Sequence, residues 1–164
     1  MNNLNDLVQH FLKDMYYAEQ QNLRSVPEML RAAQSAALKQ ALETQAQISR
    51  AQVQYLEKVF EAFGQRPEGA TCEALLGMLK EQEELLKDIG KAGPVQDAGL
   101  IAHLQAVLHY GIARYGTLLA WATELGQKQA MEILRLMLEG ARKADQTLNE
   151  LATKGINKEA HQPA

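Results

Sequence analysis

The chain has 164 residues, of which 46% are hydrophobic, 23% charged and 5% aromatic, and its formal net charge is −3. This length and composition predict a single folded domain and exclude a largely disordered chain. The slightly acidic balance, with no basic stripe, argues against nucleic acids and anionic membranes as partners. The single cysteine, Cys72, leaves no intramolecular disulfide and no CxxC metal clip.

The N-terminal sequence and the hydropathy predict a cytoplasmic protein. Residues 1–17 are polar and periodic, without the basic start or the apolar run of a secretory signal. No stretch approaches the roughly 20 continuous apolar residues that a membrane-spanning helix needs.

Apolar residues recur every three or four positions in five segments separated by Gly and Pro, and this spacing predicts helices. Pro27 marks either a kink or a new start within the first of them. Thr71 is expected to cap the third helix, while Gly90 and Gly126 are expected to end the third and the fourth. The predicted helices cover about residues 4–33, 37–63, 71–89, 97–125 and 129–151.

No segment shows the alternation of a β-strand, so the predicted fold class is all-α. Two long hairpins with a helix between them predict an antiparallel four-helix bundle with an additional helix. We expect one domain over residues 1–154, followed by a C-terminal tail at 155–164.

Five clusters, in order along nearly the whole chain, together resemble the YciF-like family of ferritin-like bacterial proteins. The clusters are LKDMYYAEQQ at 12–21, QVQYLEKVFE at 52–61, CEALLGM at 72–78, DAGLI at 97–101 and HYGIARYGTL at 109–118. This resemblance implies a ferritin-like four-helix core with an extra helix, and a homodimer built from helical hairpins. It also implies a loose connection with bacterial stress responses.

The di-metal site of ferritin-like bundles is incomplete in this sequence. Such a site needs one Glu from each of two helices and a Glu-x-x-His pair from each of two others. None of the four histidines has a Glu three residues away. Compared with the family, ligand positions of three helices carry residues without a carboxylate or imidazole: Gln45, Ile48, Leu108, Gly111, Gly140 and Ala141. The pattern predicts a metal centre converted into ordinary core.

Glu19, Glu81 and His109 are the remnant metal-ligand candidates. The structural alternative for Glu19 is an inward side chain hydrogen-bonded to Gln45 or Tyr110. Glu81 lies in an acidic run typical of a solvated helix face, and His109 is expected to be a helix-packing histidine.

The roles of Cys72 and Trp121 can each be interpreted in two ways. Cys72 is interpreted as a small buried residue rather than a redox thiol, because no partner cysteine exists. Trp121 anchors either a hairpin or an interface.

The expected function is a non-catalytic bundle that acts through self-association or a protein partner, in a stress response, with no catalytic residue and no cofactor. Motifs of hydrolases and nucleotide-binding enzymes are missing from the sequence, which favours a non-enzyme without deciding the question. The alternative is an iron or manganese oxidoreductase, or a metal store, with a reduced site that uses Glu19, Glu81 and His109. A third reading is small-ligand binding in the emptied core.

Overall fold

The computed structural model describes residues 1–161, and this part of the chain is helical throughout apart from its connections and its first residues. The predicted all-α class is therefore confirmed. The long helices are α1 (Leu4–Ala32), α2 (Ala36–Ala62), α3 (Glu73–Ile89), α4 (Pro94–Glu124) and α5 (Lys128–Leu151).

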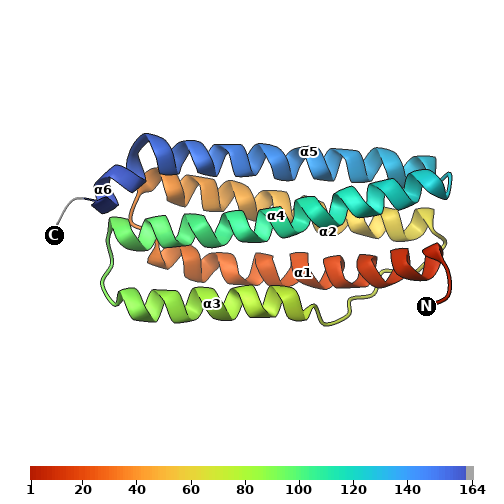
Figure 1. Cartoon of the computed structure of the whole chain (residues 1–164), viewed down its shortest axis with the longest axis horizontal. Helices are drawn as coiled ribbons and strands as arrows, with labels where there is room; N and C mark the ends of the chain where they lie inside the picture. Colours follow the sequence, from red (N-terminus) through yellow and green to blue (C-terminus); the bar gives the residue numbers. More distant parts are fainter. Residues whose placement is uncertain (162–164) are drawn as a thin grey trace.

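Four of these helices form an antiparallel bundle, and the fifth lies outside it (Figure 1). Helix α1 packs on α2, α2 on α5, α5 on α4 and α4 on α1, which closes a ring of four. Short connections at 33–35 and 125–127 join α1 to α2 and α4 to α5, so each pair is an antiparallel hairpin. Helix α3 packs on α4 from outside the ring. The predicted four-helix bundle with an additional helix is confirmed.

The chain continues in helical form beyond α5. A π-helical turn, η1 (Ala152–Ile156), leads into a short helix, α6 (Asn157–His161). Ile156 is buried in the core. Residues 155–161, expected to belong to the tail, are therefore helical, and 162–164 lie outside the described residues.

Glycine and proline define the helix boundaries largely as expected. Gly90 and Gly126 follow the ends of α3 and α4 with φ of 64° and 68°, in the left-handed region that glycine adopts without strain. The expectation that Thr71 caps α3 was wrong, because Cys72 occupies that position. Helix α4 begins earlier than expected, since Pro94 fits the first turn, where no backbone N–H donor is needed. Pro27 lies within a continuous α1 and faces solvent, so it does not start a new helix.

A carboxylate of α4 holds the connection between α1 and α2. Asp97 is buried, and its Oδ1 and Oδ2 accept hydrogen bonds from the backbone N–H groups of Gln34 (2.8 Å) and Ser35 (2.7 Å). Beside it, Nε2 of Gln96 donates to the carbonyl of Ala32 (2.7 Å). These bonds satisfy backbone groups that a helix end leaves without partners, and they join the two hairpins at one end of the bundle.

The core has two large apolar clusters at opposite ends of the bundle and a smaller third one, with Ala18, Cys72 and Leu75, where α3 meets the bundle. The cluster near the α1–α2 connection includes Met29 and Leu104, and the cluster near the α4–α5 connection includes Phe60 and Leu118. Burial of such side chains supplies about 1.5–3 kcal/mol each. A set of polar side chains lies at mid-height of the bundle and forms the candidate site. Of these only Tyr115 belongs to one of the clusters, the one near the α4–α5 connection.

Helix α3 is attached by a narrow contact. Only Leu75 and Gln82 of this helix are buried. Gly99 allows α3 to approach α4 closely, because a Cβ atom at this position would lie 3.1 Å from Cδ2 of Leu85. The additional helix is therefore peripheral to the four-helix core.

Candidate functional site

A layer of polar side chains crosses the middle of the bundle between the two apolar clusters. Its members on α1 and on α2 are three residues apart, which places each pair on one helix face. The hydroxyl of Tyr115 donates a hydrogen bond to Glu19 Oε1, and Asn22 Nδ2 donates to Ser49 Oγ at 3.1 Å. We call this layer the polar belt, and it consists of Glu19, Asn22, Ser49, Gln52 and Tyr115.

The polar belt has more acceptors than donors. Gln52 Nε2 donates to the carbonyl of Met137 at 3.4 Å, but Oε1 of Gln52, Oδ1 of Asn22 and Oε2 of Glu19 are buried without a hydrogen-bond partner. Burial raises the pKa of Glu19, and hydrogen bonding from Tyr115 and neighbouring polar groups opposes this only in part. A protonated Glu19 supplies one more donor to a region with unpaired acceptors, so the belt favours the neutral carboxylic acid.

The hydroxyl partner of Glu19 is also held in its neutral form. Burial raises the pKa of Tyr115 well above its usual value, and the nearby Glu19 carboxylate adds to the effect. Low-dielectric surroundings penalise a second negative charge beside the first. Tyr115 therefore acts as a permanent hydrogen-bond donor.

The donor set does not fit a pair of divalent cations. Two such ions need several carboxylates to balance their charge, and the polar belt contains a single carboxyl group among amides and hydroxyls. Within residues 1–161, no three His, Cys, Asp or Glu side chains lie together in a group that could hold a metal ion.

The three remnant candidates lie in different environments. The carboxyl group of Glu19 reaches the bundle interior, whereas Glu81 is exposed on α3. The side chain of His109 is 64% exposed on α4, with Nε2 at 3.2 Å from Asp145 Oδ2. The structure does not bring the three together, so the alternative reading with a reduced metal site has no geometric support.

Two of the structural alternatives for these residues need correction. The partner of Glu19 is Tyr115 rather than Gln45 or Tyr110, because Tyr115 points into the bundle one turn further along α4. His109 is a surface residue rather than a helix-packing one. The expected solvated position of Glu81 is confirmed.

The family's metal-ligand positions that hold other residues in this chain lie either in the apolar core or at the wall of a cavity. Leu108 and Ala141 are buried in the apolar cluster near the α1–α2 connection. Gln45, Ile48 and Gly140 line a cavity of about 510 Å³ between α2 and α5. Apolar and small residues at these positions thus leave a hollow on one side of the bundle.

Cys72 is buried, as expected, at the start of α3. Its Sγ lies 3.1 Å from the hydroxyl oxygen of Tyr110 on α4. Burial, followed by the hydrogen bond with Cys72, raises the pKa of Tyr110 to about 12. The pair links α3 to the bundle and gives Cys72 a packing role.

Several polar positions were not predicted as site residues. Asn22, Ser49 and Gln52 share a face with apolar neighbours, and their spacing of three from one another or from Glu19 is the signal that could have found them. His103 is also buried, and its Nε2 has no partner. Burial lowers the pKa of His103 to about 4, so the imidazole is neutral at pH 7.

None of the helices among the described residues combines the length and the apolar character needed to cross a membrane. Comparison with curated proteins finds Protein YciF of Escherichia coli (strain K12), which is 33% identical over 165 residues covering 100% of this chain and 99% of that protein.

Two solved structures have the same fold. The E. coli stress protein YciF superposes with a TM-score of 0.90 at 33% identity, over 96% of this chain and 99% of that one. YcfI, "a putative structural protein from Rhodopseudomonas palustris", gives 0.87 at 40% identity, over 90% and 94% of the two chains. Residues 3–161 match the family described as a domain of unknown function, DUF892. The expected relationship to YciF is confirmed, and the chain belongs to the DUF892 family.

Proposed function

We propose that this protein is a non-catalytic helical bundle of the bacterial stress response, which acts through self-association or by binding another protein. The observation that carries the proposal is the polar belt, in which the Tyr115 hydroxyl meets the single carboxyl group and the Asn22 amide meets the Ser49 hydroxyl at the centre of the bundle. The descriptions of the two solved relatives support it, since one is called a "stress protein" and the other a "structural protein".

The belt has a structural use that does not require a metal. Buried polar side chains cost free energy unless they are paired, so they favour the one arrangement of helices in which they meet. Here Tyr115 of α4 reaches Glu19 of α1, and Asn22 of α1 reaches Ser49 of α2. These bonds connect three of the four bundle helices and oppose sliding of one helix along another.

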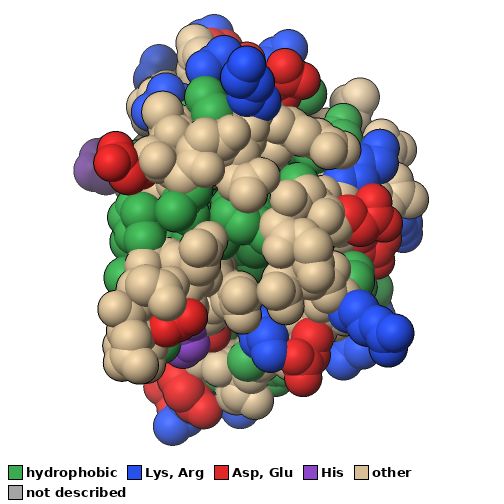
Figure 2. Space-filling view, turned by 90° about the vertical axis from the view of Figure 1, so that its right-hand side faces the viewer, with side chains coloured by type: hydrophobic (Ala, Val, Ile, Leu, Met, Phe, Trp, Pro, Cys, Tyr) green, Lys and Arg blue, Asp and Glu red, His purple; other side chains and the backbone are tan. Residues whose placement is uncertain are grey.

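The end of the bundle that carries the N-terminus also supports a protein partner over a polyanion. The end of the bundle that carries the N-terminus shows Lys and Arg side chains interspersed with Asp and Glu, with hydrophobic side chains between them (Figure 2). A nucleic-acid-binding face would carry a continuous basic patch instead.

We propose an aromatic surface on α1 and α4 as the place of self-association into a homodimer. The rings of Phe11 and Trp121 lie 5.1 Å apart, and the guanidinium of Arg114 lies 4.1 Å above Phe11. All three side chains are partly exposed. Tryptophan and arginine beside an aromatic ring are typical of the residues that dominate binding energy in protein interfaces.

Metal content tests the non-catalytic part of the proposal. The protein should be purified without chelator or affinity tag, then reloaded anaerobically with ferrous iron and, separately, with manganese. We expect substoichiometric metal and an unchanged melting temperature, because a ligand that binds only the native state must raise stability. One or two firmly held ions per chain, lost in Glu19→Gln, would refute it.

Light scattering over a range of protein concentrations tests self-association. We expect a dimer whose dissociation is promoted by Trp121→Ala. Leu136→Ala is a suitable control, because Leu136 is 57% exposed but lies on α5, outside the aromatic surface. Equal dissociation of the two variants would exclude the aromatic surface, and a monomer at every concentration would exclude the dimer.

A further inference from the structure

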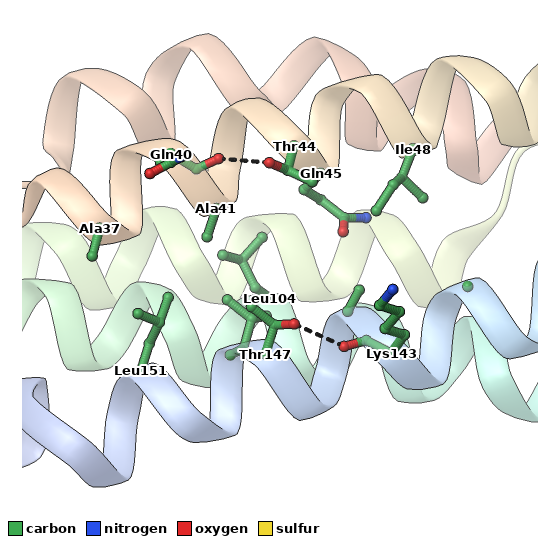
Figure 3. A pocket seen from close by; sticks show the side chains of 13 residues that line it. Ala37, Gln40, Ala41, Thr44, Gln45, Ile48, Leu104, Lys143, Thr147 and Leu151 are labelled. Atoms are coloured by element: carbon green, nitrogen blue, oxygen red, sulfur yellow. Dashed lines mark hydrogen bonds between the residues drawn. The ribbon is translucent and has the colours of Figure 1, made fainter.

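The cavity between α2 and α5 has the size and the lining of a ligand site. Its volume of about 510 Å³ falls within the range of small-molecule pockets. Small residues on the facing helices, Ala41 on α2 and Gly140 and Ala144 on α5, leave the space. Figure 3 shows Leu104 of α4 between these two helices, where it lines the inner wall. The remaining lining is mixed, with aliphatic side chains from Ala37, Ile48, Leu148 and Leu151 and polar ones from Gln40, Thr44, Gln45, Lys143 and Thr147. An apolar body of a small ligand would therefore be shielded from water there.

One polar side chain is directed into this space without a partner. Gln45 is only 8% exposed, and its amide points from α2 toward α5 in Figure 3. The hydrogen bonds drawn among the lining residues join Thr44 to Gln40 and Thr147 to Lys143, and none reaches Gln45. The amide atoms of Gln45 are not among the buried side-chain atoms left without a partner, so solvent reaches this amide from the cavity. An amide of this kind, at the wall of a hollow, is suited to hydrogen-bond the polar group of a ligand.

A single charge stands at the same cavity, and it is positive. No Asp or Glu lines the space, whereas Lys143 of α5 does. The ammonium of Lys143 is exposed and belongs to none of the ion pairs formed within residues 1–161. An amide donor and a free ammonium beside an apolar wall match the chemistry of a carboxylate attached to a hydrocarbon or aromatic body.

We propose that the α2–α5 cavity binds a small amphipathic monocarboxylate, whose carboxylate contacts the Gln45 amide and the Lys143 ammonium and whose apolar part lies against Ile48 and Leu104. The site is separate from the polar belt and requires neither a metal nor a catalytic step. It adds ligand binding to the proposed structural role, and it can be present whether or not the protein dimerises through α1 and α4.

The test uses the full chain, labelled with ¹⁵N, and titrates it with octanoate while amide resonances are followed by NMR. Octanol, which has the same hydrocarbon body but no charge, serves as the matched ligand. We expect saturable shifts of the Gln45 side-chain amide and of cavity residues, with a dissociation constant of about 0.1–1 mM for a ligand of this size, and weaker binding of octanol.

Two variants make the carboxylate contact falsifiable. Lys143→Met should weaken octanoate binding about tenfold, the effect expected from loss of one charge-assisted contact, and should leave octanol binding unchanged. Lys128→Met is the control, since Lys128 is exposed at the opposite end of α5. Because Lys143 and Lys128 are both exposed, neither change threatens folding.

Three outcomes would overturn the proposal. The first is the absence of saturable shifts at the cavity, as expected if another copy of the chain or a protein partner covers it. The second is equal affinity for octanol and octanoate. The third is an affinity for octanoate that Lys143→Met and Lys128→Met change equally.

Discussion

Replacing Asp97 with Ala should destabilise the protein strongly, although Asp97 belongs to neither apolar cluster. Its two carboxylate oxygens accept the backbone N–H groups of Gln34 and Ser35 at 2.8 and 2.7 Å, and the side chain itself is buried. A hydrogen bond to a charged group contributes about 1.5–3 kcal/mol, and the loss of two leaves both donors without a partner. The connection is part-buried, so water can bind some of the freed N–H groups. We therefore expect Asp97→Ala to lower the free energy of unfolding by about 3 kcal/mol.

Urea unfolding followed by circular dichroism, at one fixed protein concentration, measures this change. A loss of about 3 kcal/mol corresponds to a fall in melting temperature of about 6–12 °C for a chain of this size. Asp97→Asn, which keeps one acceptor, should lose about half as much. Asp88→Asn is the control, because Asp88 is exposed on α3. A change below about 1 kcal/mol for Asp97→Ala would show that the carboxylate does not hold the two hairpins together.

Three further predictions concern the interior. Burial raises the pKa of Glu19 above its usual 4.5, so ionisation of Glu19 destabilises the fold as the pH rises through the raised value. In urea titrations, Glu19→Gln should therefore be more stable than the natural protein at pH 7. When the pH is lowered to 4.5, this difference in stability should disappear. An equal gain at both pH values would contradict this. Tyr115→Phe leaves the buried Glu19 Oε1 without its donor and should cost about 1–3 kcal/mol by the same measurement. A neutral effect would mean that the bond is not formed. Burial lowers the pKa of His103 from 6.5 to about 4, so the folded state binds fewer protons in this range and stability should fall as the pH falls from 6.5 to 4. His103→Gln should flatten that part of the profile, and an unchanged slope would assign the loss to other groups.

The helices could be predicted from the sequence because their signals are local. Apolar spacing and the stops at Gly90 and Gly126 lie within a few residues of the boundaries that they define. The predicted start of α4 was less accurate, because a proline such as Pro94 is compatible both with a break between helices and with the first residue of a helix. Thr71 failed as a cap because the neighbouring Cys72 is drawn inward to Tyr110, a contact made across 38 positions of sequence.

The candidate site was only partly predictable, because its geometry depends on which helices are neighbours. The sequence singled out Glu19 as an inward carboxyl, but its partner Tyr115 is 96 residues away. Choosing between Tyr110 and Tyr115 requires the rotation of α4 about its axis, which no local pattern supplies. The same limit hid Ser49 and Gln52, whose polar character reads from sequence as an exposed helix face.

The peripheral attachment of α3 has a consequence for how the molecule opens. A segment that buries few side chains separates from the rest at low free energy, while the remaining fold stays intact. The amide protons of α3 should therefore exchange with solvent sooner than those of α1, α2, α4 and α5. Such an opening exposes Cys72 and the surface of α4 beneath it. Cys72 would then react with a thiol reagent only when α3 has separated from the bundle. The rate of its modification would therefore measure how often the chain adopts that partly unfolded form.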